Sequence, residues 1–362
     1  MKTVSVTSLE QLVETGVVHL TRGKVISKRD IAAYPGEHPI YSSAKDNDGK
    51  FGEYGKYLYD EELITWSVDG GGRLFHRPRH KFSVTNVGGV LRIQDKSVLD
   101  YRYLYYVLTL RHSEIVFDWV KKAHPSVIKK LYTSIPVPGL NEQKQIVQKL
   151  DEAFAGIAKA KENAEKNLQN ARALFESHLE TVFTQRGPGW VEKRLEECFR
   201  LKSGDALTSS AMKDGNYPVF GGNGIAGMHD KFNLSGDNVI IGRVGALCGN
   251  ARHITEKIWL TDNAFRITDS CFEFDGAFLA YLLNFKNLRS FARQTAQPVI
   301  SNSSLKDLSL QFPDIGKQKR ISEHLDLCCQ ATQRLTRLYK QKQAALEALK
   351  KSILHEAFSG NL

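Results

Sequence analysis

The feature that most constrains this chain is an internal repeat at a fixed displacement. The segment DYRYLYYVL, which begins at Asp100, matches DGAFLAYLL, which begins 175 residues later at Asp275, and the same displacement joins Gln143 to Gln318. Each copy ends in a long, charged stretch in which apolar residues recur periodically. The sequence therefore predicts one unit, a globular module followed by a long helix, that is used twice.

The earlier parts of the two modules also match, although their register drifts. Pro-Ile-Tyr at 39–41 corresponds to Pro-Val-Phe at 218–220, and the displacement here runs from 176 to 179 residues. Insertions therefore fall between strands. The modules differ most in the segments at 42–56 and 221–233, so we expect one scaffold that carries two different surfaces.

The local pattern within each module is mixed. Strand-like runs at 63–68 and 238–245 are bounded by Gly, Asn and Asp, which are typical of turns. A helix-like segment follows, and a short strand ended by proline closes each module, at 133–138 and 308–313. This order predicts an α+β fold.

Two stretches read as long helices, from about Asn141 to Thr184 and from about Lys317 to Phe358. Apolar residues recur every three or four positions along the first one. In the second, we expect a heptad seam at Cys328, Leu335, Lys342, Leu349, Ala331, Leu338 and Ala345. Amphipathic helices of this length favour packing against each other as an antiparallel coiled coil. The alternative is that each helix packs on its own module.

Composition and charge narrow the class of protein. The net charge of +10 and the pI near 9.2 favour a polyanionic partner such as nucleic acid. No run approaches the roughly 18 apolar residues that a membrane span needs, so we expect a cytoplasmic protein with no membrane partner. The 5 cysteines form no Cys-x-x-Cys pair, which argues against a disulfide framework and a zinc site. The 11 histidines show no metal-ligand spacing, and no metal is expected.

The apparent enzyme motifs are not supported by the sequence around them. Gly222, Gly224 and Gly227 fit Gly-x-Gly-x-x-Gly, but the following segment at 228–237 does not read as a helix, which a dinucleotide site needs. We interpret it as a recognition loop. The sequence has no Asn-Pro-Pro-aromatic or Asp-Pro-Pro-aromatic segment for adenine methylation and no Gly-Lys-Ser/Thr phosphate loop. We therefore expect no catalytic residues and no cofactor in this chain.

The order of module, helix, module and helix resembles the specificity subunit of type I restriction-modification systems. The resemblance rests on the Gln-Lys helix starts at 142–144 and 317–319, on GPGWVEKRLEE at 187–197 and on HEAFSGNL at 355–362. It covers essentially the whole chain. It implies target recognition domains at 1–140 and 187–315, a central spacer helix at 141–186 and a C-terminal spacer helix at 316–362.

The resemblance also implies a function. The chain would be a non-catalytic DNA-binding subunit in which each domain reads one half of a bipartite, asymmetric site, while the helices set the gap. Its partners would be double-stranded DNA, two methyltransferase subunits and translocase-nuclease subunits, with S-adenosylmethionine, ATP and Mg expected only on those subunits. Two alternatives remain, a coiled-coil protein-interaction scaffold with two binding modules and a specificity subunit that serves a methyltransferase without a nuclease.

Duplex reading needs cations for phosphates and planar or amide side chains for base edges. A charge run is usually a solvated face, but Arg73, Arg77 and Arg79 are crowded beside glycines. For the His-Pro pair at 124–125 and the Gln-Pro pair at 297–298, a structural turn explains the sequence as well as DNA contact does. We expect the methyltransferase subunits on the helices from Gln143 to Val182 and from Gln318 to Phe358. We expect DNA contact at Ser43, Lys45, Arg73, His76, Arg77, Arg79, Lys121, Lys122, His124, Asn223, Arg243, Asn250, Arg252, His253, Arg293, Gln294 and Gln297.

Overall fold

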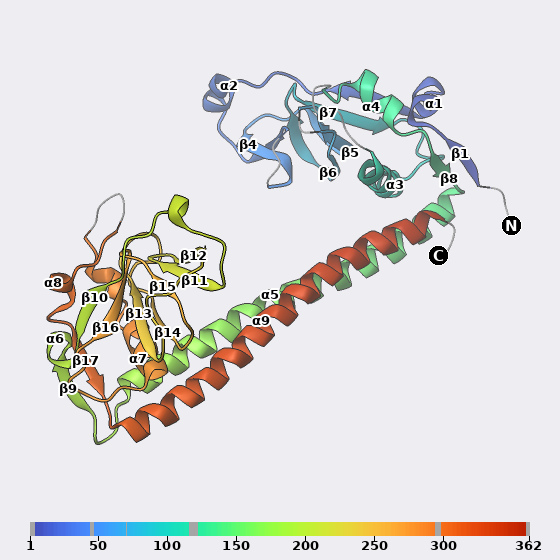
Figure 1. Ribbon diagram of the computed structural model, residues 1–362. Helices are drawn as coiled ribbons and strands as arrows, with labels where there is room; N and C mark the ends of the chain where they lie inside the picture. The colour runs from blue at the N-terminus through green and yellow to red at the C-terminus, as the bar shows by residue number, and fades with distance from the viewer. Residues whose placement is uncertain (1–3, 44–46, 70, 116–121, 294–297, 360–362) are drawn as a thin grey trace. The chain divides into compact units, whose positions relative to one another are not determined.

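The computed structural model of the chain describes residues 4–43, 47–69, 71–115, 122–293 and 298–359. The chain divides into two compact units (Figure 1). The first unit comprises residues 1–164 and 341–362, and the second comprises residues 165–340. Each unit therefore holds one globular module together with parts of two long helices.

The first module is built on a six-stranded sheet with the order β2-β7-β5-β6-β3-β4. The β3 and β6 strands pair in parallel, and the other four pairs are antiparallel. A separate pair, β1 with β8, joins the start of the module to its end. The elements are β1 (Ser5–Thr7), α1 (Leu9–Glu14), β2 (Val18–Arg22), α2 (Lys28–Ala33), β3 (His38–Tyr41), β4 (Lys50–Tyr54), β5 (Tyr59–Ser67), β6 (Leu74–Val84), β7 (Gly88–Ile93), α3 (Tyr101–Glu114), α4 (Pro125–Leu131) and β8 (Ile135–Val137).

The second module contains a four-stranded sheet, β10-β16-β13-β14, a three-stranded sheet, β12-β11-β15, and the pair β17-β9. The β11 and β15 strands pair in parallel. The elements are β9 (Val191–Arg194), α6 (Leu195–Cys198), β10 (Arg200–Ser203), β11 (Tyr217–Gly221), β12 (Gly224–His229), β13 (Asn238–Gly242), β14 (Ala251–Ile254), β15 (Trp259–Leu260), β16 (Ala264–Thr268), α7 (Gly276–Phe285), α8 (Asn302–Leu305) and β17 (Ser309–Phe312).

The two modules share one topology. The order β2-β7-β5-β6 in the first corresponds to β10-β16-β13-β14 in the second, and the hairpin β3-β4 corresponds to β11-β12. In the first module one long strand, β6, runs on to pair with β3, whereas β14 and β15 share that role in the second. The repeat read from the sequence is therefore a repeat of structure, and the predicted α+β class is confirmed.

The core of each module lies between the sheet and one helix, α3 or α7. Asp100 caps α3 by accepting hydrogen bonds from the backbone N–H groups of Arg102 and Tyr103, and Asp275 caps α7 in the same way. In the first core, Trp66 lies flat on the strand at Gly89, where an added Cβ atom would come within 1.9 Å of the indole Cε2. Gly89 is thus required by this close approach.

The repeated glutamines tie each module to its long helix. Gln143 is fully buried, and its Oε1 accepts from the backbone N–H of Asp100 while its Nε2 donates to the carbonyls of Val98 and Pro138. Gln318 accepts from Asp275 in the equivalent way. Buried backbone groups at the start of a helix need such partners. This requirement explains why the match between the copies is held in register here.

A second repeated contact joins each module to its long helix. The Tyr106 hydroxyl donates to Oδ1 of Asp151 over 2.6 Å, and the Tyr281 hydroxyl donates to Oδ1 of Asp326 over 2.7 Å. Burial and the neighbouring carboxylate raise the pKa of Tyr106 to about 12, so the hydroxyl stays a donor at neutral pH. The same two residue types therefore perform the same task in both units.

The long helices are α5 (Leu140–Thr184) and α9 (Ile315–Ser359), each of 45 residues. In the first unit Lys161 of α5 pairs with Glu347 of α9, with 2.6 Å between Nζ and Oε1. In the second unit the ring of His178 on α5 meets the ring of His324 on α9. Residue numbers rise along α5 as they fall along α9, so the helices run antiparallel, as predicted.

The predicted seam is correct for α5 and wrong for α9. On α5 apolar residues of the expected periodicity are buried at Leu150, Ile157, Ala164, Leu168 and Ala171. On α9 the expected seam is exposed at Ala331, Leu335, Leu338, Ala345 and Leu349. Its more covered stripe is displaced by one position and consists of Thr332, Thr336, Tyr339, Gln343 and Leu346. The helix therefore covers a mixed stripe and leaves a leucine-rich one facing solvent.

Among the described residues, no helix is both long enough and apolar enough to cross a bilayer.

Candidate DNA-recognition surfaces

The loops at one end of the first module lie close together. The Ser43 hydroxyl, after β3, donates to the carbonyl of Val87 and accepts from the backbone N–H of Asp69 over 3.2 Å. Ala123 donates its backbone N–H to Val68 over 2.8 Å. Segments that follow β3 and β5 and that precede β7 and α4 therefore meet here, and Ser43 lies at their centre.

Lys122 and His124 belong to this loop cluster. The Nζ of Lys122 lies 3.1 Å from Oδ1 of Asp69, and its side chain is largely exposed. His124 is half-buried at the N-cap of α4 and makes no side-chain cap hydrogen bond. Lys45 and Lys121 lie outside the described residues. The cluster therefore presents at least one exposed cation beside a hydroxyl group.

The other predicted residues of the first module lie along β6. Arg73 is exposed just before this strand, and its guanidinium lies 5.2 Å from the Phe75 ring centroid. His76 contacts Glu62 at 2.7 Å. Arg79 is exposed, with 77% of its side chain accessible, and its Nε lies 3.5 Å from Asp60. Arg73 and Arg79 are therefore both accessible to solvent, whereas His76 is half-buried.

Arg77 differs from its neighbours because it is buried. Its Nε donates to the Thr65 hydroxyl over 3.1 Å, and its guanidinium lies 3.5 Å from the Tyr41 ring centroid. A terminal nitrogen donates to the carbonyl of Asp48 over 2.5 Å. Burial lowers the pKa of Arg77 to about 10, so the group stays charged at neutral pH. It ties β6 to the loop that carries Asp48.

The second module brings together the equivalent loops. The Asn223 side chain, after β11, accepts from the backbone N–H of Leu247 over 2.9 Å. The Gly245 N–H donates to Pro298, and the Ile300 N–H donates to the carbonyl of Arg243. The glycine motif therefore lies at the β11–β12 hairpin and within these loops, with no helix after it, which supports its interpretation as a recognition loop.

Arg243 is half-buried at the root of this second loop cluster. One terminal nitrogen lies 3.3 Å from the Ser203 hydroxyl and 3.4 Å from the carbonyl of Asp262. Its guanidinium lies 5.3 Å from the ring centroid of Phe265. The Nε atom is buried and has no hydrogen-bond partner among the described residues. The side chain can therefore still donate a hydrogen bond if the loops rearrange around a ligand.

The remaining predicted residues divide between loop and strand. Asn250 is exposed in the loop before β14, and Arg293 is exposed in an isolated bridge to Val299. Arg252 and His253 lie on β14, where the Nε2 of His253 is 2.7 Å from Asp237. Gln294 and Gln297 lie outside the described residues.

One cation of this cluster was not predicted individually. Arg289 is exposed in the 3₁₀ turn Leu288–Phe291, and its guanidinium donates to the carbonyl of Ala246 over 2.5 Å. The signal in the sequence is the pair of arginines at 289 and 293, but the sequence alone does not show which of them reaches the 243–250 loop. The structure shows that Arg289 makes this contact.

Comparisons with known proteins agree with this architecture. A model of the type I restriction modification DNA specificity domain matches residues 2–167 and again 188–348. A type I restriction enzyme EcoprrI specificity subunit from Escherichia coli is 30% identical over 158 residues, which cover 42% of this chain and 39% of that protein. The matches to the first relatives span between 33% and 54% of their own lengths.

Solved structures share the fold. A chain from a study of complex assembly and conformational transition of the type I R-M system covers 95% of this chain and 98% of its own length, with a TM-score of 0.71 and 16% identity. The HsdS subunit from Thermoanaerobacter tengcongensis covers 96% and 97%, with a TM-score of 0.58 and 17% identity. At such identities the likeness concerns the fold alone.

The family model accounts for both globular modules and for most of both long helices, once per copy of the repeat. Members of this family are specificity subunits, which are non-catalytic in type I systems and carry no cofactor of their own. The chain therefore belongs to the family of the type I restriction-modification DNA specificity subunits.

Proposed function

We propose that this chain reads a bipartite, asymmetric DNA site, with one half recognised by each module. One observation carries the proposal, namely that two modules of the same strand order bear unlike loop clusters at the same end of the sheet. A shared scaffold positions both clusters in the same way. The unlike side chains then give each cluster its own sequence preference.

The proposed recognition domains comprise residues 1–140 and 187–315. In the first, we assign direct contact to exposed groups such as Lys122 and Arg79, whereas buried Arg77 positions the loop at Asp48. In the second, Asn250 and Arg293 are exposed in the loop cluster. Lysine and arginine suit phosphates, and an amide suits base edges.

The segments at 141–186 and 316–362 are proposed as spacers that set the gap and bind the methyltransferase subunits. The support is the exposed leucine stripe of α9, where Leu327 is 65% exposed, Leu338 50% and Leu349 48%. Together with Leu335, two of these residues line a groove of about 600 Å³. Aligned exposed leucines are typical of a protein-binding surface. Two methyltransferase subunits, and translocase-nuclease subunits where restriction occurs, are the proposed partners.

The deciding experiment maps methylation. The chain is co-expressed with the methyltransferase subunit encoded beside it, and modified adenines are located by single-molecule sequencing of the host genome. We expect one two-part motif with a fixed gap. A stable complex without any motif would contradict the DNA-recognition proposal and favour a protein-interaction scaffold. Adding the nuclease subunit then separates a restriction system from a methyltransferase that acts alone.

Single substitutions test the assignment of each half. Asn250→Ala is expected to relax the motif only in the half read by the second module, by about 1–3 kcal/mol if the amide contacts a base edge. The matched control is Asn216→Ala, because Asn216 is exposed just before β11, at the opposite end of this strand from Asn223. A change in both halves, or an equal effect of the control, would argue against independent reading.

A further inference from the structure

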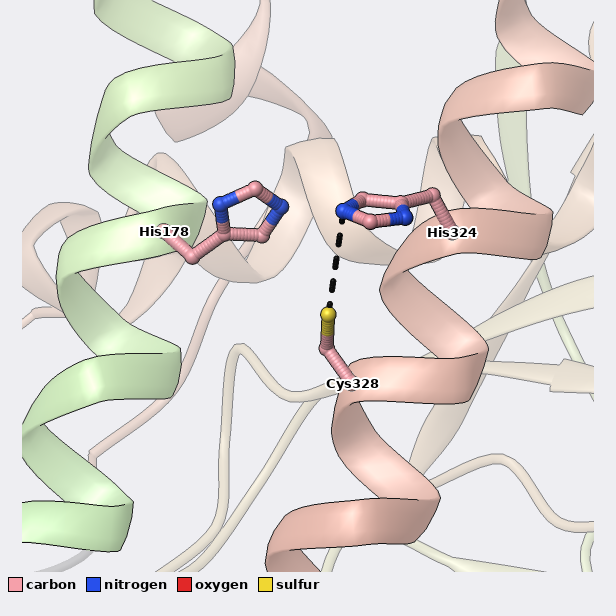
Figure 2. A group of neighbouring side chains, drawn as sticks. All are labelled: His178, His324 and Cys328. Carbon is pink, nitrogen blue, oxygen red and sulfur yellow. Dashed lines mark hydrogen bonds between the residues drawn. The ribbon is translucent and has the colours of Figure 1, made fainter.

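Three potential metal ligands meet between the long helices of the second unit. His178 of α5 and His324 of α9 point toward each other, and Cys328 lies one turn along α9 (Figure 2). One ligand atom from each residue lies within 4.8 Å of the others. The sequence predicted no metal, because His178 is distant from the other two residues along the chain.

His178 follows a run of apolar positions. At intervals of seven before it, α5 carries Leu150, Ile157, Ala164 and Ala171, which are buried and apolar, and at the start of the helix Gln143, whose buried side chain is fully hydrogen-bonded. At His178 this position carries an imidazole whose Nε2 is buried and has no hydrogen-bond partner among the described residues. A buried polar atom without a hydrogen-bond partner destabilises the fold. Apolar packing alone therefore does not account for a histidine at this position.

The contacts that His178 does make provide no such partner. Its ring meets that of His324 edge to face, with 4.8 Å between centroids and 71° between planes. The Nε2 of His324 lies 3.8 Å from the Sγ of Cys328, a weak contact within α9. Three groups with lone pairs thus point at one small volume without satisfying one another.

The donor set matches a particular class of ion. Two imidazole nitrogens and one thiolate are ligands that zinc prefers, at about 2.0–2.1 Å for nitrogen and about 2.3 Å for sulfur. Tetrahedral geometry at these bond lengths separates a nitrogen from a sulfur by about 3.6 Å. The His324–Cys328 separation of 3.8 Å is already close to this value. Their spacing of four residues places both on one helix face.

We propose that His178, His324 and Cys328 bind a zinc ion that links α5 to α9, with water as the fourth ligand. His324 is exposed while the other two ligands are half-buried, so the ion reaches the site from solvent. The zinc satisfies the buried Nε2 of His178 and adds a link between the two helices within the second unit. All three ligands belong to the second unit, so the site is complete within it.

Metal titration of the reduced, metal-free full-length chain tests the proposal. Calorimetry with Zn²⁺ is expected to show one tight site per chain, and Co²⁺ is expected to give a thiolate-to-cobalt charge-transfer absorption. In Cys328→Ala that absorption disappears, and the zinc affinity falls at least about 100-fold, since even losing an outer-shell partner costs 10- to 100-fold. Zinc also raises the melting temperature of the wild type.

Three further variants serve as controls for the thiol and for folding. Cys329→Ala and Cys271→Ala change neighbouring and exposed thiols and are expected to keep the site. His178→Leu extends the apolar series of α5, so it should fold without metal and yet no longer be stabilised by zinc. Retention of the tight site and the cobalt absorption in Cys328→Ala, or an unchanged zinc response in His178→Leu, would overturn the proposal, as would a wild type that binds no zinc.

Discussion

Replacing Gln143 by leucine tests whether the repeated glutamines hold each module to its helix. The side chain is fully buried and makes three hydrogen bonds to backbone groups, with Asp100 as donor and Val98 and Pro138 as acceptors. Leucine is similar in size but leaves all three groups without a partner. At about 1–3 kcal/mol for each such group, and with water reaching some of them, we expect Gln143→Leu to lose about 3–6 kcal/mol.

This loss is large beside the roughly 5–15 kcal/mol that stabilises a typical domain. Urea unfolding followed by far-ultraviolet circular dichroism measures it. Hydrogen exchange locates it, because Gln143→Leu should speed exchange in α3 and spare α7, whereas Gln318→Leu should do the reverse. The matched control is Gln148→Leu, which changes an exposed glutamine one turn further along α5 and should stay within about 0.5 kcal/mol.

The reasoning would be refuted if Gln143→Leu and Gln318→Leu each lost less than about 1 kcal/mol while keeping native dichroism. Such a result would mean that the backbone groups find other partners at little cost. Faster exchange in both α3 and α7 after a single substitution would refute a different step, the independence of the two modules.

Three shorter predictions follow from other contacts. The Arg92 guanidinium lowers the pKa of Glu61. This ion pair therefore stabilises the fold above the ordinary pKa of a glutamate, and the stabilisation disappears as the pH falls through the lowered pKa of Glu61. Glu61→Gln should lose at most about 1 kcal/mol of unfolding free energy at neutral pH, and its stability in urea titrations should depend less on acid pH. Leu335→Asp should abolish co-purification with the methyltransferase subunit without changing circular dichroism. Burial raises the pKa of Cys198 to about 11, so mass spectrometry after alkylation of the native chain should find exposed Cys271 labelled well before Cys198.

Sequence reasoning predicted the framework well because the framework residues have repeated tasks. The fixed displacement links Asp100 to Asp275 and Gln143 to Gln318, and these four residues form the same cap and the same buried hydrogen bonds. Both long helices begin within two residues of their predicted starts. Because both copies need the same helix cap and the same buried hydrogen bonds, these residues keep the same spacing in both. This constant spacing is visible in the sequence.

The face of α9 could not be predicted because the helix carries two stripes of heptad spacing. The stripe through Leu335 and Leu338 is the more apolar, yet the stripe through Thr332, Tyr339 and Leu346 is the more covered. Hydrophobic periodicity identifies the more apolar stripe of a helix. Which stripe is covered depends on how its side chains pack against those of the partner helix. A leucine stripe left exposed is then available to another protein.

The exposure of individual site residues could not be predicted either. Arg77 and Arg79 are two residues apart on one strand, so both project from the same face of β6 by spacing alone. One is 4% exposed and holds the Asp48 loop, while the side chain of the other is 77% accessible. The pairing of β5 with β6 shifts register between Glu61 and Leu63, opposite residues 77–80, which breaks the alternation of faces there, and the Tyr41 and Phe75 rings cover Arg77. Such coverage depends on strands far apart in sequence, and no charge pattern contains it.

The framework residues and the proposed recognition residues are largely separate in this chain. The contacts that fix each module to its helix use Gln143, Asp151 and their repeats, whereas the loop clusters around Ser43 and Asn223 use other side chains. Loops can thus change without loss of the contacts that fix each module to its long helix. Residues such as Arg77 and Arg243 are the exception, since each is half or fully buried and also contacts a loop that we propose for recognition. Substituting them should cost stability and DNA binding together, which distinguishes them from the exposed Lys122 and Asn250.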